Sequence, residues 1–162
     1  MSLSRFFYLV WSGFARSGLK GVAIAVMSIM AFVPMGVASI TINVTNDNGG
    51  SLTARVGEIR RIRRLGQVVE IHEGYCNSAC TLYLGLPKTC VSPTAQFGFH
   101  GPQIATHGLV MLPSQFEYWS QLMADHYPKP IRDWFMRVAR HSTDLIMIKG
   151  DLLIALGVSQ CA

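Results

Sequence analysis

The segment VVEIHEGYCNSACTLYLGL, residues 68–86, decides how this chain folds. The β-branched residues at its start predict a short strand over 68–72. Residues 74–80 form a turn rich in small side chains, and the apolar residues 81–86 predict a helix that continues from it. A strand that leads through a turn into a helix is typical of an α/β protein, and Ser78 stands in that turn.

The sequence on both sides continues this alternation of strands and helices. Further strands are predicted at residues 40–44, 89–91 and 96–100, and helices at 52–65, 113–126 and 131–140. The helix over 52–65 has apolar residues at three-residue spacing, Val56, Ile59, Ile62 and Leu65. We therefore expect an α/β fold with a mainly parallel sheet, whose ligand site lies at the carboxyl ends of the strands. Both Ser78 and the pair Gly49 and Gly50 stand at such ends.

The first 38 residues differ from the rest in composition. They contain three basic residues and no acidic one, and no charged residue occurs from 21 to 46. A basic start, an apolar stretch and small residues before Ala38 are the anatomy of an export signal cleaved after Ala38. An uncleaved membrane anchor and a buried core helix are the alternatives. Signal and anchor both place the domain of residues 39–162 outside the cytoplasm, free or held at the membrane.

Charge and composition exclude several classes of protein. The chain has 162 residues, of which half are hydrophobic and 14% charged, which indicates one folded domain. Beyond residue 38, 11 basic residues face 9 acidic ones. This balance, and a run of four arginines at 60–64 without aromatic partners, favours a solvated helix face over nucleic-acid binding. Binding of this run to anionic lipid is a weaker alternative. No nucleotide-binding or metal-binding motif occurs, so we expect neither cofactor nor metal.

All four cysteines lie in the domain predicted to be exported, at Cys76, Cys80, Cys90 and Cys161. An even number of cysteines in an oxidising compartment predicts two disulfides. The sequence leaves all three pairings open, although a bridge between Cys90 and Cys161 would fix the C-terminus to the core. A zinc site is the alternative, and the spacing of Cys76 and Cys80 disfavours it because zinc knuckles have two residues between their cysteines.

Ser78 has the surroundings that a nucleophilic serine needs. Small neighbours allow a tight strand-to-helix turn, and the start of a helix favours negative charge that develops during attack. A serine at the start of a helix is also an ordinary N-cap, so this local pattern by itself leaves both interpretations open.

Three segments of the chain resemble segments of a known protein family. Residues 46–53 (NDNGGSLT), 74–80 (GYCNSAC) and 97–102 (FGFHGP) resemble, in order and approximate spacing, three signature segments of the Clp protease proteolytic subunit. The likeness extends over roughly residues 40–158. The paired cysteines make the chain most similar to exported, periplasmic Clp-like proteins of bacteria. This resemblance implies that the domain lies in the periplasm, free or held at the inner membrane. The resemblance implies the Clp and crotonase-like fold, a spiral of β-β-α units.

The resemblance also implies a catalytic machinery. It assigns Ser78 as nucleophile, His100 as general base, and the backbone N–H groups of Gly50 and Ala79 as the oxyanion hole. Asp144 is the best match to the third residue, with Asp151 and Asp133 as alternatives, and a backbone carbonyl could orient His100 instead. We therefore expect a serine peptidase that acts on peptides or unfolded proteins and self-associates. Because Asn77 and Cys80 replace small apolar residues of the family, an inactive, disulfide-stabilised binding or assembly module is the alternative.

Overall fold

The structure is a computed structural model that describes residues 40–104 and 109–162. The chain divides into two units, Met1–Gly36 and Val37–Ala162, and the second contains every described element. The predicted signal or anchor, residues 1–38, lies outside the described residues. Within the described ranges, no helix has the length and apolar character needed to cross a membrane.

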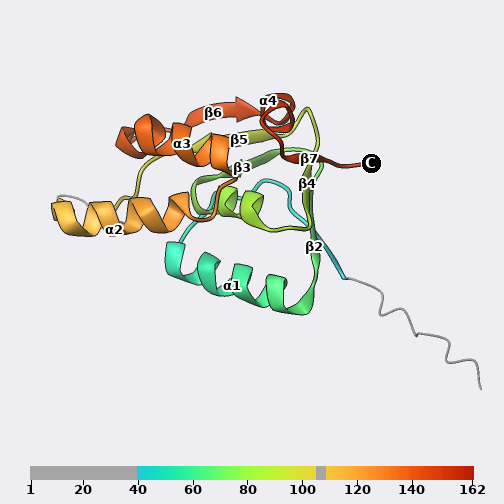
Figure 1. The fold of residues 1–162 in the computed structure, drawn as a ribbon, viewed down its shortest axis with the longest axis horizontal. Coiled ribbons are helices and arrows are strands. Elements are labelled where there is room, and N and C mark those ends of the chain that lie inside the picture. The colour runs from blue at the N-terminus through green and yellow to red at the C-terminus, as the bar shows by residue number, and fades with distance from the viewer. Residues whose placement is uncertain (1–39, 105–108) are drawn as a thin grey trace, which may run out of the picture. The chain divides into compact units, whose positions relative to one another are not determined.

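In the described part of the chain, seven strands form two small sheets (Figure 1). The strands are β1 (Thr41–Asn43), β2 (Val68–Ile71), β3 (Tyr75–Asn77), β4 (Thr89–Val91), β5 (Gln96–Phe99), β6 (Ile146–Lys149) and β7 (Ser159–Gln160). The first sheet has the order β1-β2-β4-β7 with all pairs parallel. In the second, β3-β5-β6, β3 runs parallel to β5 and β6 antiparallel to it. The prediction of an α/β fold with a mainly parallel sheet is confirmed.

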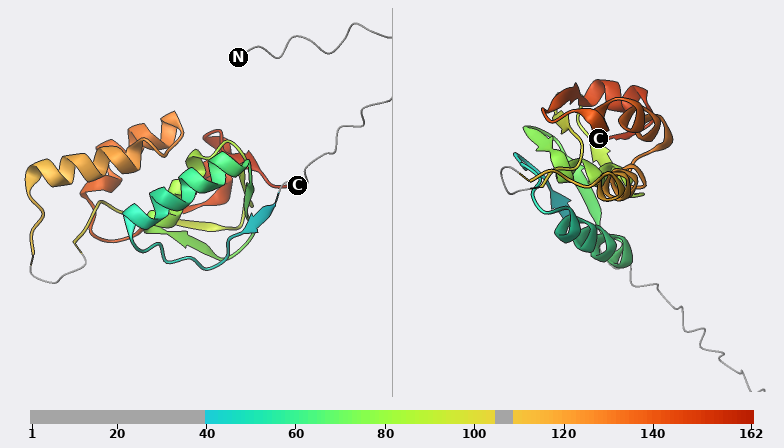
Figure 2. Two further views of the ribbon diagram at one scale, coloured as in Figure 1. Left: turned by 90° about the horizontal axis from the view of Figure 1, so that it is seen from below. Right: turned by 90° about the vertical axis from the view of Figure 1, so that its left-hand side faces the viewer.

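Helices follow the strands along the chain. They are α1 (Leu52–Leu65), the 3-10 helix η1 (Ser78–Gly85), α2 (Pro113–Ala124), α3 (Lys129–Arg137), the 3-10 turn η2 (Ala139–His141) and α4 (Gly150–Ala155). In Figure 1, α1 lies on one side of the strands and α3 on the other, and Figure 2 shows α2 extending beyond the strands. The buried aromatic residues of the core include Tyr83, Phe97, Phe99 and Phe135.

The chain repeats one pattern three times. β2 is followed by β3 and then η1, and β4 is followed by β5 and then α2. β1 is followed by Asp47, which forms an isolated parallel bridge with Cys76 of β3, and then by α1. In each repeat the chain therefore passes from the first sheet to the second and then into a helix.

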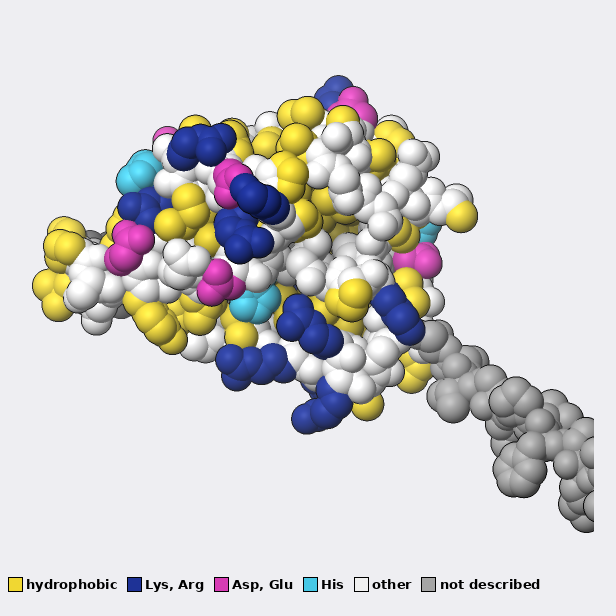
Figure 3. Space-filling model, viewed as in Figure 1, with side chains coloured by type: hydrophobic (Ala, Val, Ile, Leu, Met, Phe, Trp, Pro, Cys, Tyr) yellow, Lys and Arg dark blue, Asp and Glu magenta, His cyan; other side chains and the backbone are white. Residues whose placement is uncertain are grey.

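Helix α1 has the predicted bounds because local sequence signals fix both its start and its end. The Ser51 hydroxyl accepts a hydrogen bond from the Ala54 N–H (3.4 Å), and Gly66 ends the helix in a left-handed conformation. Ile59 and Ile62 are fully buried, but Leu65 is 60% exposed. Leu65 is exposed because nine residues are about two and a half helical turns, so it faces away from Val56. The arginines of residues 60–64 are exposed over α1 (Figure 3), as expected for a solvated face.

Two disulfides join the four cysteines and confirm that prediction. Cys76 pairs with Cys80, and Cys90 pairs with Cys161. A zinc site at these cysteines is excluded because each sulfur is bonded to another in a disulfide. The second bridge joins β4 to the residue that follows its neighbour β7, near the C-terminus, and both bridges indicate an oxidising compartment.

Candidate active site

A cavity of about 680 Å³ opens at the carboxyl ends of β3 and β5. Ser78 and Ala79, which follow β3, and His100, which follows β5, contribute to its wall. Gly50, from the glycine loop (residues 46–51) that precedes α1, contributes as well. The structure therefore brings four of the predicted site residues to one cavity, at the strand ends where parallel sheets bind ligands.

Ser78 has an unusual backbone conformation. Its φ is +53°, and Asn46 is the only other described non-glycine residue with a positive φ. β3 ends at Asn77 and η1 begins at Ser78, so the serine occupies the sharp turn between strand and helix. Strain of this kind collects at functional sites. The N-cap of η1 is Asn77, and the Ser78 hydroxyl has no hydrogen-bond partner among the described residues, so the interpretation of Ser78 as a cap was wrong.

The buried hydroxyl groups of Thr81 and Tyr127 support this turn from the core of the protein. The Thr81 hydroxyl donates to the Ser78 carbonyl oxygen (2.7 Å). Because that hydroxyl has only one proton, the bond of 2.8 Å between Thr81 and Tyr127 must be donated by the Tyr127 phenol. Burial raises the pKa of Tyr127, so the phenol keeps the proton it donates. The conformation at Ser78 is thus held by a chain of hydrogen bonds from the core.

Ser78→Gly is expected to be more stable than Ser78→Ala by about 1 kcal/mol, because glycine adopts a positive φ without a Cβ penalty and alanine keeps it. Urea unfolding of the two oxidised variants measures the difference. Both variants lack the hydroxyl, so the comparison isolates backbone strain. A glycine variant no more stable than the alanine variant would contradict the strained turn.

The side chain of His100 is held by a hydrogen bond to the residue that follows it in its own loop. Its Nδ1 lies 2.6 Å from the Gly101 carbonyl oxygen. A carbonyl oxygen only accepts, so Nδ1 carries the proton in this contact, and the neutral ring keeps a lone pair on Nε2. That tautomer is the one a general base requires. It corresponds to the alternative in which a backbone carbonyl orients the histidine.

The structure does not bring Asp144 to His100. Asp144 is exposed and outside the cavity wall, and its backbone carbonyl accepts a hydrogen bond from the Ser142 hydroxyl (2.7 Å). Among the described residues no hydrogen bond joins it to the histidine. The two alternatives also lie elsewhere: Asp151 accepts from the Leu152 N–H (2.7 Å), and Asp133 pairs with Lys129 (2.6 Å).

The glycine loop packs directly on the serine turn. A Cβ on Gly49 would lie 2.6 Å from the Asn77 carbonyl oxygen and 2.8 Å from the Ala79 nitrogen, so only glycine fits there. Gly50 differs, because no atom lies within 4 Å of the position of its missing Cβ. The N–H groups of Gly50 and Ala79 form no hydrogen bond within the described residues. Both are therefore free to donate to a bound oxyanion.

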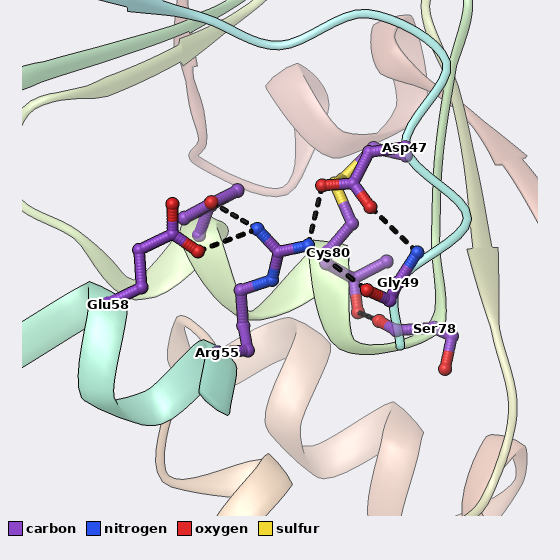
Figure 4. Close-up of polar contacts among 9 residues, drawn as sticks. Asp47, Gly49, Arg55, Glu58, Ser78 and Cys80 are labelled. Atoms are coloured by element: carbon purple, nitrogen blue, oxygen red, sulfur yellow. Dashed lines mark hydrogen bonds and ion pairs between the residues drawn. A yellow bond between two sulfur atoms is a disulfide. The ribbon is translucent and has the colours of Figure 1, made fainter. Parts of the chain in front are cut away.

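An ionic cluster holds the glycine loop from the side of α1 (Figure 4). Arg55 of α1 pairs with Asp47 (2.6 Å) and with Glu58 (3.0 Å), and its guanidinium lies over the Tyr83 ring, 4.6 Å from the ring centre. No role was predicted from the sequence for Arg55 or Asp47. A signal for Arg55 was present, because it precedes Ile59 and Ile62 by four and seven residues and so lies beside the buried stripe of α1.

Comparison with known proteins finds no family model that matches this chain and no curated protein that does. The class of this protein is therefore described from its fold and its cavity alone. It is an α/β protein in which a strained serine and a histidine share one cavity wall with Gly50 and Ala79, whose backbone N–H groups form no hydrogen bond within the described residues.

Proposed function

We propose that this protein is an exported or membrane-anchored serine hydrolase, a peptidase of the Clp and crotonase-like class. The observation that carries the proposal is the positive φ of Ser78 in a cavity wall that also contains His100, Gly50 and Ala79. The three strand-strand-helix repeats support the proposed spiral of β-β-α units. The two disulfides support export to the periplasm.

The proposed mechanism passes through an acyl-enzyme. Nε2 of His100 takes the Ser78 proton while the serine oxygen attacks the carbonyl carbon of the substrate. The N–H groups of Gly50 and Ala79 stabilise the oxyanion. Collapse breaks the bond to the leaving amine, which receives the proton from His100, and water then hydrolyses the ester by the same route in reverse. In this mechanism the Gly101 carbonyl holds the imidazole, and the carboxylate of Asp144 is not needed.

The walls of the cavity support a peptide substrate. Apolar side chains line it beside Ser78, among them Leu52, Met111, Trp119 and Met123. They would receive an apolar side chain of a short or unfolded peptide. Self-association, and membrane attachment through an uncleaved leader, belong to the same proposal, which needs neither a cofactor nor nucleic acid.

The test is intact mass spectrometry of the oxidised protein before and after treatment with a fluorophosphonate. The wild type is expected to gain one adduct, whereas Ser78→Ala gains none and the surface variant Ser114→Ala labels like the wild type. His100→Ala is expected to label on the order of 10²- to 10⁴-fold more slowly, because it lacks the base. The untreated mass also shows whether the chain begins at residue 39.

The alternative is a binding or assembly module without catalysis. The observation that favours it is the Cys76–Cys80 bridge, which closes covalently around the turn that bears Ser78. A folded, oxidised wild type that takes up no adduct would exclude the hydrolase and leave this module.

A further inference from the structure

Arg55 is a nearly buried cation beside the candidate site, with its side chain 10% exposed. One guanidinium nitrogen donates to the Asp47 carboxylate (2.6 Å) and to the Gly49 carbonyl oxygen (3.2 Å). The other donates to Glu58 (3.0 Å) and to the Tyr83 hydroxyl. A single side chain therefore connects α1 and η1 to the glycine loop, as Figure 4 shows.

Asp47 completes this connection from within the loop. Its carboxylate accepts the Gly49 N–H (2.7 Å), so both polar groups of the Gly49 backbone contact the Asp47–Arg55 pair. Its own backbone bonds to β3 on both sides, through its N–H to Tyr75 (2.8 Å) and through its carbonyl to the Asn77 N–H (2.8 Å). Asp47 thus lies between Arg55 and the strand that ends at Ser78.

The charges explain why the pair is stable in its buried position. Burial by itself lowers the pKa of Arg55, but the carboxylates of Asp47 and Glu58 raise it, and the pKa lies above its ordinary value. The guanidinium stays charged, and its planar fork lets it bind several acceptors at once. A lysine has one compact ammonium group and cannot reproduce this set of contacts.

Gly50 depends on these contacts for its position. Its φ is +101°, and no atom lies within 4 Å of the position of its missing Cβ, so nothing on that side holds it. On its other side it is bonded to Gly49, whose N–H and carbonyl are both held by the Asp47–Arg55 pair. The direction of the Gly50 N–H is therefore set through Gly49.

We infer that Arg55, acting through Asp47, is a positioning residue that aims the Gly50 N–H at the oxyanion. The inference rests on the proposed hydrolase function and adds a residue that touches neither substrate nor reacting atoms. An oxyanion contact strengthens as charge develops in the transition state. Loss of Arg55 is therefore expected to slow the chemical step and to leave initial binding of the probe nearly unchanged.

The test measures fluorophosphonate labelling of the full-length, oxidised protein over a range of probe concentrations. Arg55→Met is expected to lower the maximal labelling rate constant on the order of 10- to 100-fold, with half-saturation by the probe changed less than twofold. Arg55→Lys is expected to fall between it and the wild type. The matched control is Arg140→Met, because Arg140 also pairs with a glutamate (Glu117, 3.0 Å) and lies over an aromatic ring (Phe116, 5.4 Å) but contacts no part of the glycine loop. It is expected to label at the wild-type rate.

Two readouts separate positioning from a purely structural role. Arg55→Met is expected to reach full labelling of Ser78 slowly, whereas a structural defect would reduce the final labelled fraction and leave the rate constant of the folded fraction unchanged. The second outcome overturns the inference, as does an unchanged rate. If Arg55→Met does not fold, Asp47→Asn is measured instead, with the same expected direction. A wild type that is not labelled overturns the proposed function as well, whereas a labelled wild type with an unaffected Arg55 variant overturns this inference alone.

Discussion

Gly49→Ala is expected to abolish the labelling of Ser78 and to lower the free energy of unfolding by about 3 kcal/mol, the sum of overpacking and a strained positive φ. The new methyl group would lie 2.6 Å from the Asn77 carbonyl oxygen and 2.8 Å from the Ala79 nitrogen. Both are backbone atoms of the turn that carries Ser78, so the clash cannot be relieved by a side-chain rotation. Urea unfolding and probe labelling of the same variant measure the two effects.

Gly57→Ala is the matched control for this experiment. Gly57 lies inside α1 with nothing within 4 Å of the position of a Cβ. Alanine there is expected to raise the free energy of unfolding by about 1 kcal/mol, the difference in helix propensity, and to leave labelling unchanged. The close packing of the glycine loop on the serine turn would be refuted by a Gly49→Ala variant that labels at the wild-type rate.

Removal of the Cys90–Cys161 bridge by a double alanine substitution is expected to cost about 4 kcal/mol, against about 2 kcal/mol for the Cys76–Cys80 bridge. The difference arises because the first closes a loop with a sequence separation of 71 residues and the second one of only 4. A longer loop removes more conformational freedom from the unfolded chain. The measurement is the denaturation midpoint of each double variant under the same conditions.

In the rate of probe labelling, the two double alanine variants are expected to rank in the opposite order. The short bridge closes around Ser78, whereas the long one joins β4 to the residue that follows β7, outside the cavity wall. Loss of the short bridge should therefore slow the labelling of Ser78 more than loss of the long bridge, although it costs less stability. Equal stabilities, or equal labelling of the two folded variants, would show that the bridges do not have these separate roles.

The elements that the sequence predicted well are those with local signals. α1 has its N-cap at Ser51 and its left-handed stop at Gly66, and both ends were predicted to the residue. β3 was missed, because residues 75–77 have no strand pattern and are extended through pairing with β5 and with Asp47. The antiparallel pairing of β6 with β5 likewise depends on contacts between residues about 50 positions apart in the sequence, which no local pattern reports.

The candidate site shows the same division. Ser78, His100, Gly50 and Ala79 were proposed from motifs and share one cavity wall. The carboxylate could not be assigned in this way, because the segment around Asp144 has no distinctive pattern and its side chain is exposed. Arg55 was missed because a charged residue on an amphipathic helix is ordinarily solvated. Its burial results from Asp47 and Tyr83, which lie 8 and 28 residues away.

The bridge between Cys90 and Cys161 makes residues 90–161 a covalent ring. His100 lies on this ring, whereas Ser78 and the glycine loop lie on the part of the chain that precedes it. A single backbone cut inside the ring, for example in the exposed segment at Leu109 and Val110, leaves one molecule with all of its parts attached. Such a nicked chain separates into fragments only after reduction, whereas after a cut between Cys80 and Cys90 only non-covalent contacts keep the serine with the histidine.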